Sequence, residues 1–279
     1  MPKQKTLKNS VEVTGKGLHS GVEVQMKLKP AEVDSGIFFV RTDLAEKNKI
    51  CATAQNVTST LRATTLEENG VKVFTIEHLM SALAVCGIDN CAVEMNAEEP
   101  PVLEGNSIGF FEMIKSAGIL EQSADKKIIS LEKVYRADSD DGKKFITALP
   151  YDGFRISFTS INPHPLIGIQ FEDFEITEEI YAKEIAPART IAYEKEVEAL
   201  HAAGLGRGGT LENVIVYNDS GWLNKLKYPD ELVRHKILDV IGDLRLAGFL
   251  KCHIIAVASG HALNAKLIKK IYADFFSEK

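Results

Sequence analysis

Apolar and polar side chains alternate along several stretches of the chain, which is the pattern of half-buried β-strands. The clearest stretch is residues 22–28, closed by Pro30, and a turn at residues 34–36 leads from it to a second predicted strand, Ile37–Arg41. In the second half of the chain, residues 154–158 alternate in the same way. Both halves are therefore expected to begin as sheet.

Apolar residues with helical spacing follow the strands in both halves. They predict helices over residues 76–86, 107–117, 193–203, 231–247 and 262–276. The first helix has Thr75 as its expected N-cap and Gly87 as its stop. Strands followed by helices, twice over, predict an α+β fold of two similar layered domains packed on each other. The polar segment 122–127 is the candidate linker, which gives domains of residues 1–124 and 128–279.

Composition excludes several classes of function. The 279 residues are 45% hydrophobic, enough for a sizeable core, and the formal net charge is −6. No run of Lys and Arg could follow a phosphate backbone, so no nucleic acid partner is expected. The N-terminus lacks the apolar core of a secretory signal and no segment approaches the roughly 20 apolar residues that span a bilayer, so we expect a cytoplasmic protein. The four cysteines form no CxxC pair, so any metal must be held by His and carboxylate.

One polar stripe stands out on the mostly apolar helix predicted at residues 231–247. His235, Asp239 and Asp243 recur every four residues and share one face. A His and an Asp one turn apart can direct a nitrogen and an oxygen at the same point, as a zinc ion requires of two helical ligands. A polar stripe on the protein surface, or a His/Asp pair that only satisfies its own hydrogen bonds, is the alternative.

The pair Glu77-His78 interrupts the apolar start of the helix predicted at residues 76–86. His78 could complete a His, His, Asp site that leaves a fourth position for water, and Glu77 could take the proton of that water. The alternative is a solvated Glu-His pair, which the apolar neighbours disfavour.

A third candidate lies between the predicted strand His253–Ala258 and the last helix. His261 follows a glycine there and could act as a general acid, oriented by Asp243. An ordinary loop histidine is the alternative. Thr190 carries a hydroxyl that could donate to a developing oxyanion. The remaining histidines lack partners of this kind and are expected to be structural: His19, His164, His201 and His253.

The glycine-rich segment 204–210 has neither the Lys-Ser/Thr ending of a P-loop nor the spacing of a dinucleotide fingerprint. We expect it to be a loop that lets a ligand approach closely.

Five segments, in the same order along nearly the whole chain, resemble the UDP-3-O-acyl-N-acetylglucosamine deacetylase family. They are Gly15–Gly21, Thr75–Leu79, Ala188–Thr190, Val233–Leu244 and Ser259–Asn264. The resemblance implies two α+β domains, each with a small insert, and a zinc site between the domains. The first insert would fall at about residues 50–73 and the second at about residues 191–217.

The resemblance also implies roles for individual residues. It makes His78, His235 and Asp239 the zinc ligands and Glu77 the general base. His261 would stabilise charge and protonate the leaving amine. Two further residues would assist: Asp243 would hold His261, and Thr190 would help to bind the oxyanion. Lys236 would contact phosphate or hydroxyl groups of the substrate.

In this family the second insert forms an apolar passage for the fatty acyl chain of the substrate. The candidates to line it here are Ile191, Val197, Leu200, Thr210, Val214 and Val216. A small local core is the alternative reading of these residues. Leu61 and Gly208 are further predicted substrate contacts.

Three segments depart from the usual pattern of the family. The chain has Ile191 after Ala-Arg-Thr, Glu104-Gly-Asn106 in place of Asp-Gly-Ser, and Pro163-His-Pro165 in place of Asn-His-Pro. None of them is a predicted metal ligand or the base, so they concern acyl packing and substrate contacts.

The function implied is removal of the N-acetyl group from UDP-3-O-acyl-N-acetylglucosamine in lipid A biosynthesis, by a monomer that touches membranes at most transiently. Iron could replace zinc in a His, His, Asp site. The rival readings are a zinc amidohydrolase acting on another N-acyl substrate, and a non-catalytic binding module with a structural zinc.

Overall fold

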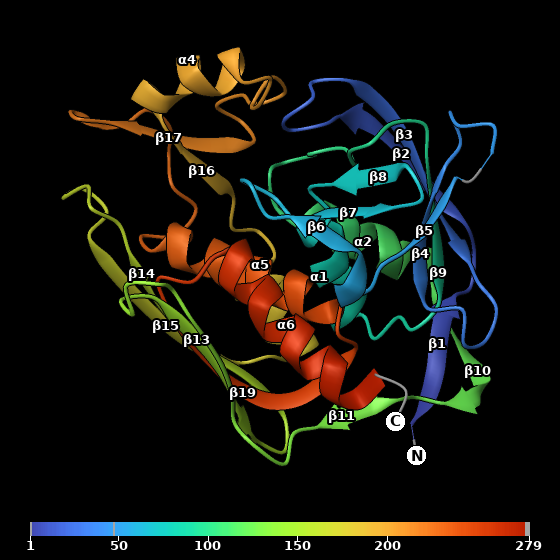
Figure 1. Cartoon of the computed structure of the whole chain (residues 1–279). Helices are drawn as coiled ribbons and strands as arrows, with labels where there is room; N and C mark the ends of the chain where they lie inside the picture. The colour runs from blue at the N-terminus through green and yellow to red at the C-terminus, as the bar shows by residue number, and fades with distance from the viewer. Residues whose placement is uncertain (1, 47, 277–279) are drawn as a thin grey trace.

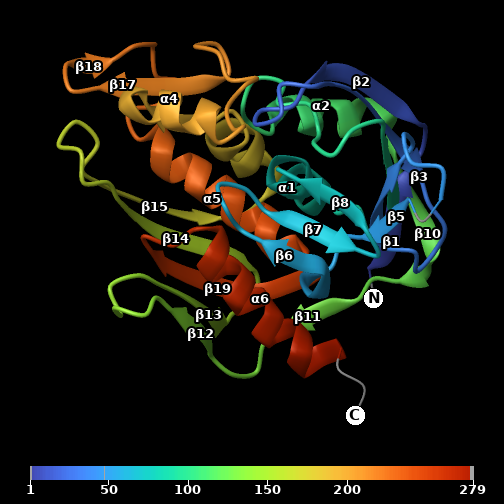
Figure 2. The same ribbon diagram turned by 45° about the horizontal axis from the view of Figure 1, so that its top comes forward.

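The computed structural model describes residues 2–46 and 48–276 and has an α+β fold of two domains, as the sequence predicts. Two large sheets lie on the outside, and the long helices lie between them (Figure 1). Figure 2 shows the same layers from a second direction, with a smaller sheet and a helix at one end of the molecule.

The N-terminal half carries a five-stranded sheet in the order β2-β3-β9-β4-β5. The alternation predicted at residues 22–28 is seen in β3, which buries every second side chain. Two helices cover the inner side of this half (Figure 1). The elements are β2 (Val11–Lys16), β3 (Glu23–Pro30), β4 (Ile37–Arg41), β5 (Lys49–Cys51), β9 (Cys91–Met95), α1 (Glu77–Val85) and α2 (Ile108–Ala117).

The C-terminal half carries a six-stranded sheet in the order β12-β13-β19-β14-β15, with β11 paired to β19. Its two long helices, α5 and α6, lie on the face that looks toward the N-terminal half (Figure 1). The elements are β11 (Ile128–Ser130), β12 (Tyr135–Asp138), β13 (Phe145–Pro150), β14 (Phe154–Ile161), β15 (Ile169–Glu175), β19 (Phe249–Val257), α5 (Glu231–Arg245) and α6 (His261–Phe276).

Two three-stranded sheets correspond to the segments expected as inserts. The first contains β6 (Val57–Ser59), β7 (Thr65–Glu68) and β8 (Val71–Phe74), preceded by the short helix η1 (Ala54–Asn56). The second contains β16 (Thr190–Tyr193), β17 (Val214–Asn218) and β18 (Gly221–Trp222), with α4 (Glu194–Ala202) between its first two strands. The short helices α3 (Glu178–Ile180) and η2 (Tyr181–Ile185) precede the second sheet.

Helices α1 and α5 cross closely at the centre of the molecule, inside one apolar core that draws residues from both halves. Gly242 makes this crossing possible. A Cβ atom at this position would lie 2.0 Å from the backbone oxygen of Glu77. The absence of a side chain therefore brings the two predicted metal-binding helices together.

Two local expectations differ from the structure. Segment 122–127 is not a free linker, because β10 (Ile119–Asp125) pairs with β1 (Lys3–Leu7). Its polar composition reflects the exposure of β10, whereas its partner β1 is mostly buried. Thr75 does not cap α1: its φ is +56°, and its hydroxyl donates to Glu99 instead. None of the helices among residues 2–46 and 48–276 is long and apolar enough to cross a membrane.

Candidate metal centre and active site

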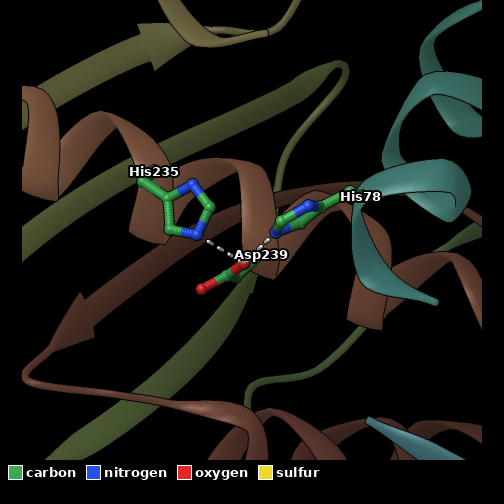
Figure 3. Close-up of side chains that lie close together, drawn as sticks. All are labelled: His78, His235 and Asp239. Carbon is green, nitrogen blue, oxygen red and sulfur yellow. Dashed lines mark ion pairs between the residues drawn. The ribbon is translucent and has the colours of Figure 1, made fainter. Parts of the chain in front are cut away.

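Three of the predicted ligands meet at one point between α1 and α5. Figure 3 shows His78 on α1 facing His235 and Asp239, which lie one turn apart on α5. The Oδ1 atom of Asp239 lies 3.5 Å from Nε2 of His235 and 3.9 Å from Nε2 of His78. One ligand atom from each residue lies within 4.8 Å of the others, and all three residues are buried.

Buried hydrogen bonds support the two histidines among the predicted ligands. Nδ1 of His235 lies 3.0 Å from the carbonyl oxygen of Ala188, which fixes the ring so that Nε2 faces Asp239. The carbonyl oxygen of His78 accepts hydrogen bonds from the hydroxyls of Ser81 and Ser107, at 3.1 and 2.6 Å. The start of α1 is thus fixed by buried groups that do not bind the metal themselves.

The protonation of these groups suits a metal ion. Burial lowers the pKa of His78 to about 3 and also lowers that of His235. Burial opposes ionisation of Asp239, but Lys236 and His235 lower the pKa of its carboxyl below the ordinary value. Neutral imidazoles and an ionised carboxylate are the forms that bind metals, and two nitrogens and one oxygen are a donor set that zinc accepts. The residues therefore fit a metal ion.

Glu77 lies beside the ligands and is buried. Burial raises the pKa of its carboxyl to about 7, against the attraction of His261. Its Oε1 lies 3.8 Å from Nε2 of His261, and its Oε2 accepts a hydrogen bond from the amide of Thr64 at 3.2 Å. A carboxyl with this pKa can both take and release a proton near neutral pH.

His261 begins α6, and its ring contacts Asp243. Nδ1 of His261 lies 2.9 Å from Oδ2 of Asp243, which also accepts from the amide of Asn264 at 2.8 Å. The other oxygen, Oδ1, accepts from the hydroxyl of Thr64 at 2.5 Å. Burial alone would lower the pKa of His261, but the carboxylates of Asp243 and Glu77 raise it to about 10. The ring is therefore a positively charged imidazolium, protonated on both nitrogens, at neutral pH.

These groups open onto one large cavity of about 1050 Å³. Its wall includes all six small or apolar residues of the second insert that were expected to line a passage, together with Thr190 at the start of β16. The residues are Ile191, Val197, Leu200, Thr210, Val214 and Val216. Lys236 also lines the cavity, although its amino group lies 2.7 Å from Oδ2 of Asp239 and so contacts a predicted ligand.

Two predicted substrate contacts do not lie in the cavity wall. Leu61 is 74% exposed. Gly208 packs against the 17–21 turn, where a Cβ would lie 2.0 Å from the backbone oxygen of Gly17. The close approach that the glycine-rich segment permits at this position is between two parts of the chain.

The sequence did not predict several other residues that lie at the site. His19, His164 and His201 line the cavity, whereas we expected them to be structural. The Gly-rich segment 15–21 was a signal for His19. Thr64 had no such signal, because its contacts with Glu77 and Asp243 are set by tertiary packing. His253 bonds Ser157, and His201 bonds a backbone oxygen, so neither joins the metal site.

A buried His, His, Asp donor set beside a carboxyl and a protonated imidazole, all facing one cavity, is the arrangement of a metal-dependent hydrolase. Comparison with known proteins narrows the class. The sequence model described as LpxC, UDP-3-O-acyl N-acetylglycosamine deacetylase, matches residues 4–273. The chain therefore belongs to the LpxC family, and the resemblance found in the five sequence segments is confirmed.

Similar proteins from several bacteria carry the name UDP-3-O-acyl-N-acetylglucosamine deacetylase. The protein of Hahella chejuensis is 45% identical over 279 residues, which cover 98% of this chain and 92% of that protein. That of Marinobacter nauticus is 43% identical over 279 residues, with 98% and 91% covered. That of Myxococcus xanthus is 45% identical over 274 residues, with 97% and 87% covered.

Proposed function

We propose that this protein hydrolyses the N-acetyl group of UDP-3-O-acyl-N-acetylglucosamine, giving acetate and UDP-3-O-acyl-glucosamine in lipid A biosynthesis. The observation that carries the proposal is the buried His78, His235 and Asp239 group beside Glu77 and His261, in a chain whose relatives are named for this activity. A cytoplasmic location and domain limits of residues 1–124 and 128–279 are parts of the same proposal.

His78, His235 and Asp239 would hold a zinc ion, with iron as the other metal that this donor set accepts. When bound, the ion supplies Lewis-acid chemistry, which polarises the amide carbonyl and lowers the pKa of water. Lys236 would bind phosphate or hydroxyl groups of the substrate, and its contact with Asp239 would keep its amino group close to the reacting centre.

Glu77 would act as the general base. Its carboxylate takes a proton from water while the water oxygen forms a bond to the acetyl carbon. The hydroxyl of Thr190 would donate a hydrogen bond to the oxygen of the former carbonyl. Both residues line the same cavity, which supports this division of roles.

His261 would act as the general acid. An amide releases its amine only when the nitrogen is protonated, and the imidazolium of His261 can supply that proton as the carbon–nitrogen bond breaks. The hydrogen bond to Asp243 keeps Nδ1 occupied, so the proton transferred is the one on Nε2. The products are acetate and a free amine on the sugar.

The apolar part of the cavity wall would receive the acyl chain. Val197, Val214 and Val216 belong to the second insert and line the same cavity as the metal-binding residues. Their branched and small side chains can enclose a narrow alkyl chain without a polar group to desolvate.

The decisive experiment is acetate release from UDP-3-O-acyl-N-acetylglucosamine by the purified protein, before and after chelation and with zinc or iron restored. We expect activity to disappear with the metal and to return with it. Metal-independent activity would contradict the proposed site. Equal cleavage of free acetylated sugars would favour an amidohydrolase acting on another N-acyl substrate.

A further inference from the structure

One buried carboxylate near the cavity, that of Glu99, takes no part in the proposed hydrolysis. Glu99 is 1% exposed, and it accepts hydrogen bonds from three neutral donors, one of which is shared between its two oxygens. Oε1 accepts from the hydroxyl of Thr75 at 2.8 Å and from the amide of His19 at 2.9 Å. Oε2 accepts from the amide of Ser20 at 2.8 Å and from that of His19 at 3.1 Å. Burying a charge costs free energy unless hydrogen bonds such as these compensate for the lost water.

The first contact of Glu99 reaches the helix that carries the base and a metal ligand. Thr75 lies two residues before Glu77, and its φ of +56° is in the left-handed region. That conformation is unfavourable for a β-branched residue and persists only where neighbours enforce it. The hydrogen bond from Thr75 to Glu99 supplies such a constraint, immediately before α1 begins.

The other contacts of Glu99 reach the 17–21 turn, which contributes Leu18 and His19 to the cavity wall. Gly17 leaves space for the carboxylate, because a Cβ there would lie 2.3 Å from Oε2 of Glu99. Backbone hydrogen bonds also connect this turn to the glycine-rich loop of the second insert. The amide of Gly208 donates to the oxygen of Leu18 at 3.0 Å, and that of Arg207 donates to the oxygen of His19 at 3.2 Å.

We propose that Glu99 is a positioning residue that fixes the start of α1 and the 17–21 turn to each other, and so sets the distance between the reacting groups and the wall of the acyl passage. This inference rests on the proposed function. The carboxylate of Glu99 matters because both of its oxygens must accept hydrogen bonds, which the oxygen and the NH₂ group of an amide at the same place cannot both do.

Three variants separate this role from a general effect on folding. Glu99→Gln keeps the size of the side chain but places an NH₂ group against amide donors. Thr75→Val removes only the hydroxyl that reaches Glu99. Glu98→Gln is the matched control, because the side chain of Glu98 is 45% exposed and belongs to neither contact.

The kinetic test compares kcat and KM for substrates with long and short acyl chains. In Glu99→Gln we expect kcat to fall about tenfold or more and KM to rise for the long chain only. In Thr75→Val we expect about a tenfold lower kcat with an unchanged KM, since the turn keeps its bonds to Glu99. Bound metal should equal that of the wild type in all three variants. Wild-type kcat and KM in folded, metal-loaded Glu99→Gln would overturn the proposal.

Hydrogen exchange tests the anchoring without any substrate. The backbone amides of His19 and Ser20 should exchange at least about tenfold faster in Glu99→Gln than in wild type and in Glu98→Gln, because their acceptor is lost. Unchanged protection of both amides would refute the proposal. Should the wild type release no acetate while this protection changes as expected, the proposed function would fail and the anchoring would stand. Thr75→Val answers the kinetic question if Glu99→Gln does not fold.

Discussion

The cavity joins two regions that are built differently. The proposed reacting groups lie on α1, α5 and α6, which contribute large parts of their surfaces to the main apolar core. The second insert, by contrast, packs through two small apolar clusters, and none of the residues of α4 is buried. Thr190 and Ile191 lie where one region passes into the other.

The difference in packing implies that the helical region holds its side chains precisely, whereas the second insert can adapt to what it binds. Metal ligands and proton-transfer groups must keep their positions within fractions of an ångström, and packed helices with supporting hydrogen bonds achieve this. A wall that receives a flexible alkyl chain tolerates a less densely packed element, whose local stability is low. Substitutions in the two regions should therefore change different kinetic parameters.

The largest effect is expected at the packed region, in Glu77→Gln. Removing a general base should lower kcat about 10²–10⁴-fold, while the three ligands still bind metal. Acetate release and bound metal are measured on the same preparation. Glu198→Gln, on the exposed face of α4, is the control. Wild-type turnover in Glu77→Gln would rule out this residue as the base.

Gly242→Ala should show how closely the same region is packed. The new Cβ would lie 2.0 Å from the backbone oxygen of Glu77, which cannot move aside as the end of a flexible side chain could. Separation of α1 from α5 should destabilise the fold by ~1–3 kcal/mol and weaken metal binding. Thermal unfolding and metal titration measure both. The control is Gly260→Ala, where a Cβ meets nothing within 4 Å. Equal stability of the two variants would contradict the tight crossing.

The packed region was also the part that the sequence predicted best. His235 and Asp239 repeat at helical spacing on an apolar helix, and Glu77-His78 interrupts an apolar segment, so local patterns alone mark them as unusual. The resemblance to the deacetylase family then predicted that these two segments form one metal site. Fold class followed from the same kind of pattern, because period and order of elements are local properties.

Contacts between distant segments could not be predicted in this way. Thr75 looked like an N-cap, but its hydroxyl bonds Glu99, 24 residues away. Thr64 supports Asp243 across 179 residues of sequence. The polar residues 122–127 resembled a linker because a largely exposed strand such as β10 and a loop share the same composition. Each of these features depends on which surfaces meet after folding.

In the insert, Val197→Trp should change substrate choice with little effect on chemistry. Val197 is half-buried on α4 and lines the cavity, so an indole ring there narrows the passage. We expect KM for a long-chain substrate to rise about tenfold, and kcat with a short-chain substrate to stay near wild type. Because α4 buries none of its residues, thermal stability should hardly change. Glu198→Trp is the control on the outer face, and equal KM changes in both variants would refute this position for the passage.

The smallest effect concerns an ion pair that connects the two inserts. Arg62, in the loop before β7, lies 3.0 Å from a carboxylate oxygen of Glu196 on α4, and both residues line the cavity. Their side chains are 50% and 46% exposed, so solvent screens the attraction. A pair of this kind contributes ~0–1 kcal/mol, which corresponds to less than about a fivefold change in KM for a long-chain substrate.

A double-mutant cycle with Arg62→Ala and Glu196→Ala isolates the coupling between the two side chains. We expect the coupling in KM to stay below about fivefold at low salt and to disappear at ~1 M salt, because the Debye length there is only about 3 Å. Coupling that persists at high salt would mean that the two inserts are held by packing as rigidly as α1 and α5 are, and the contrast between the two regions would no longer hold. Coupling that is lost with salt would confirm that the link between Arg62 and Glu196 is a screened charge pair.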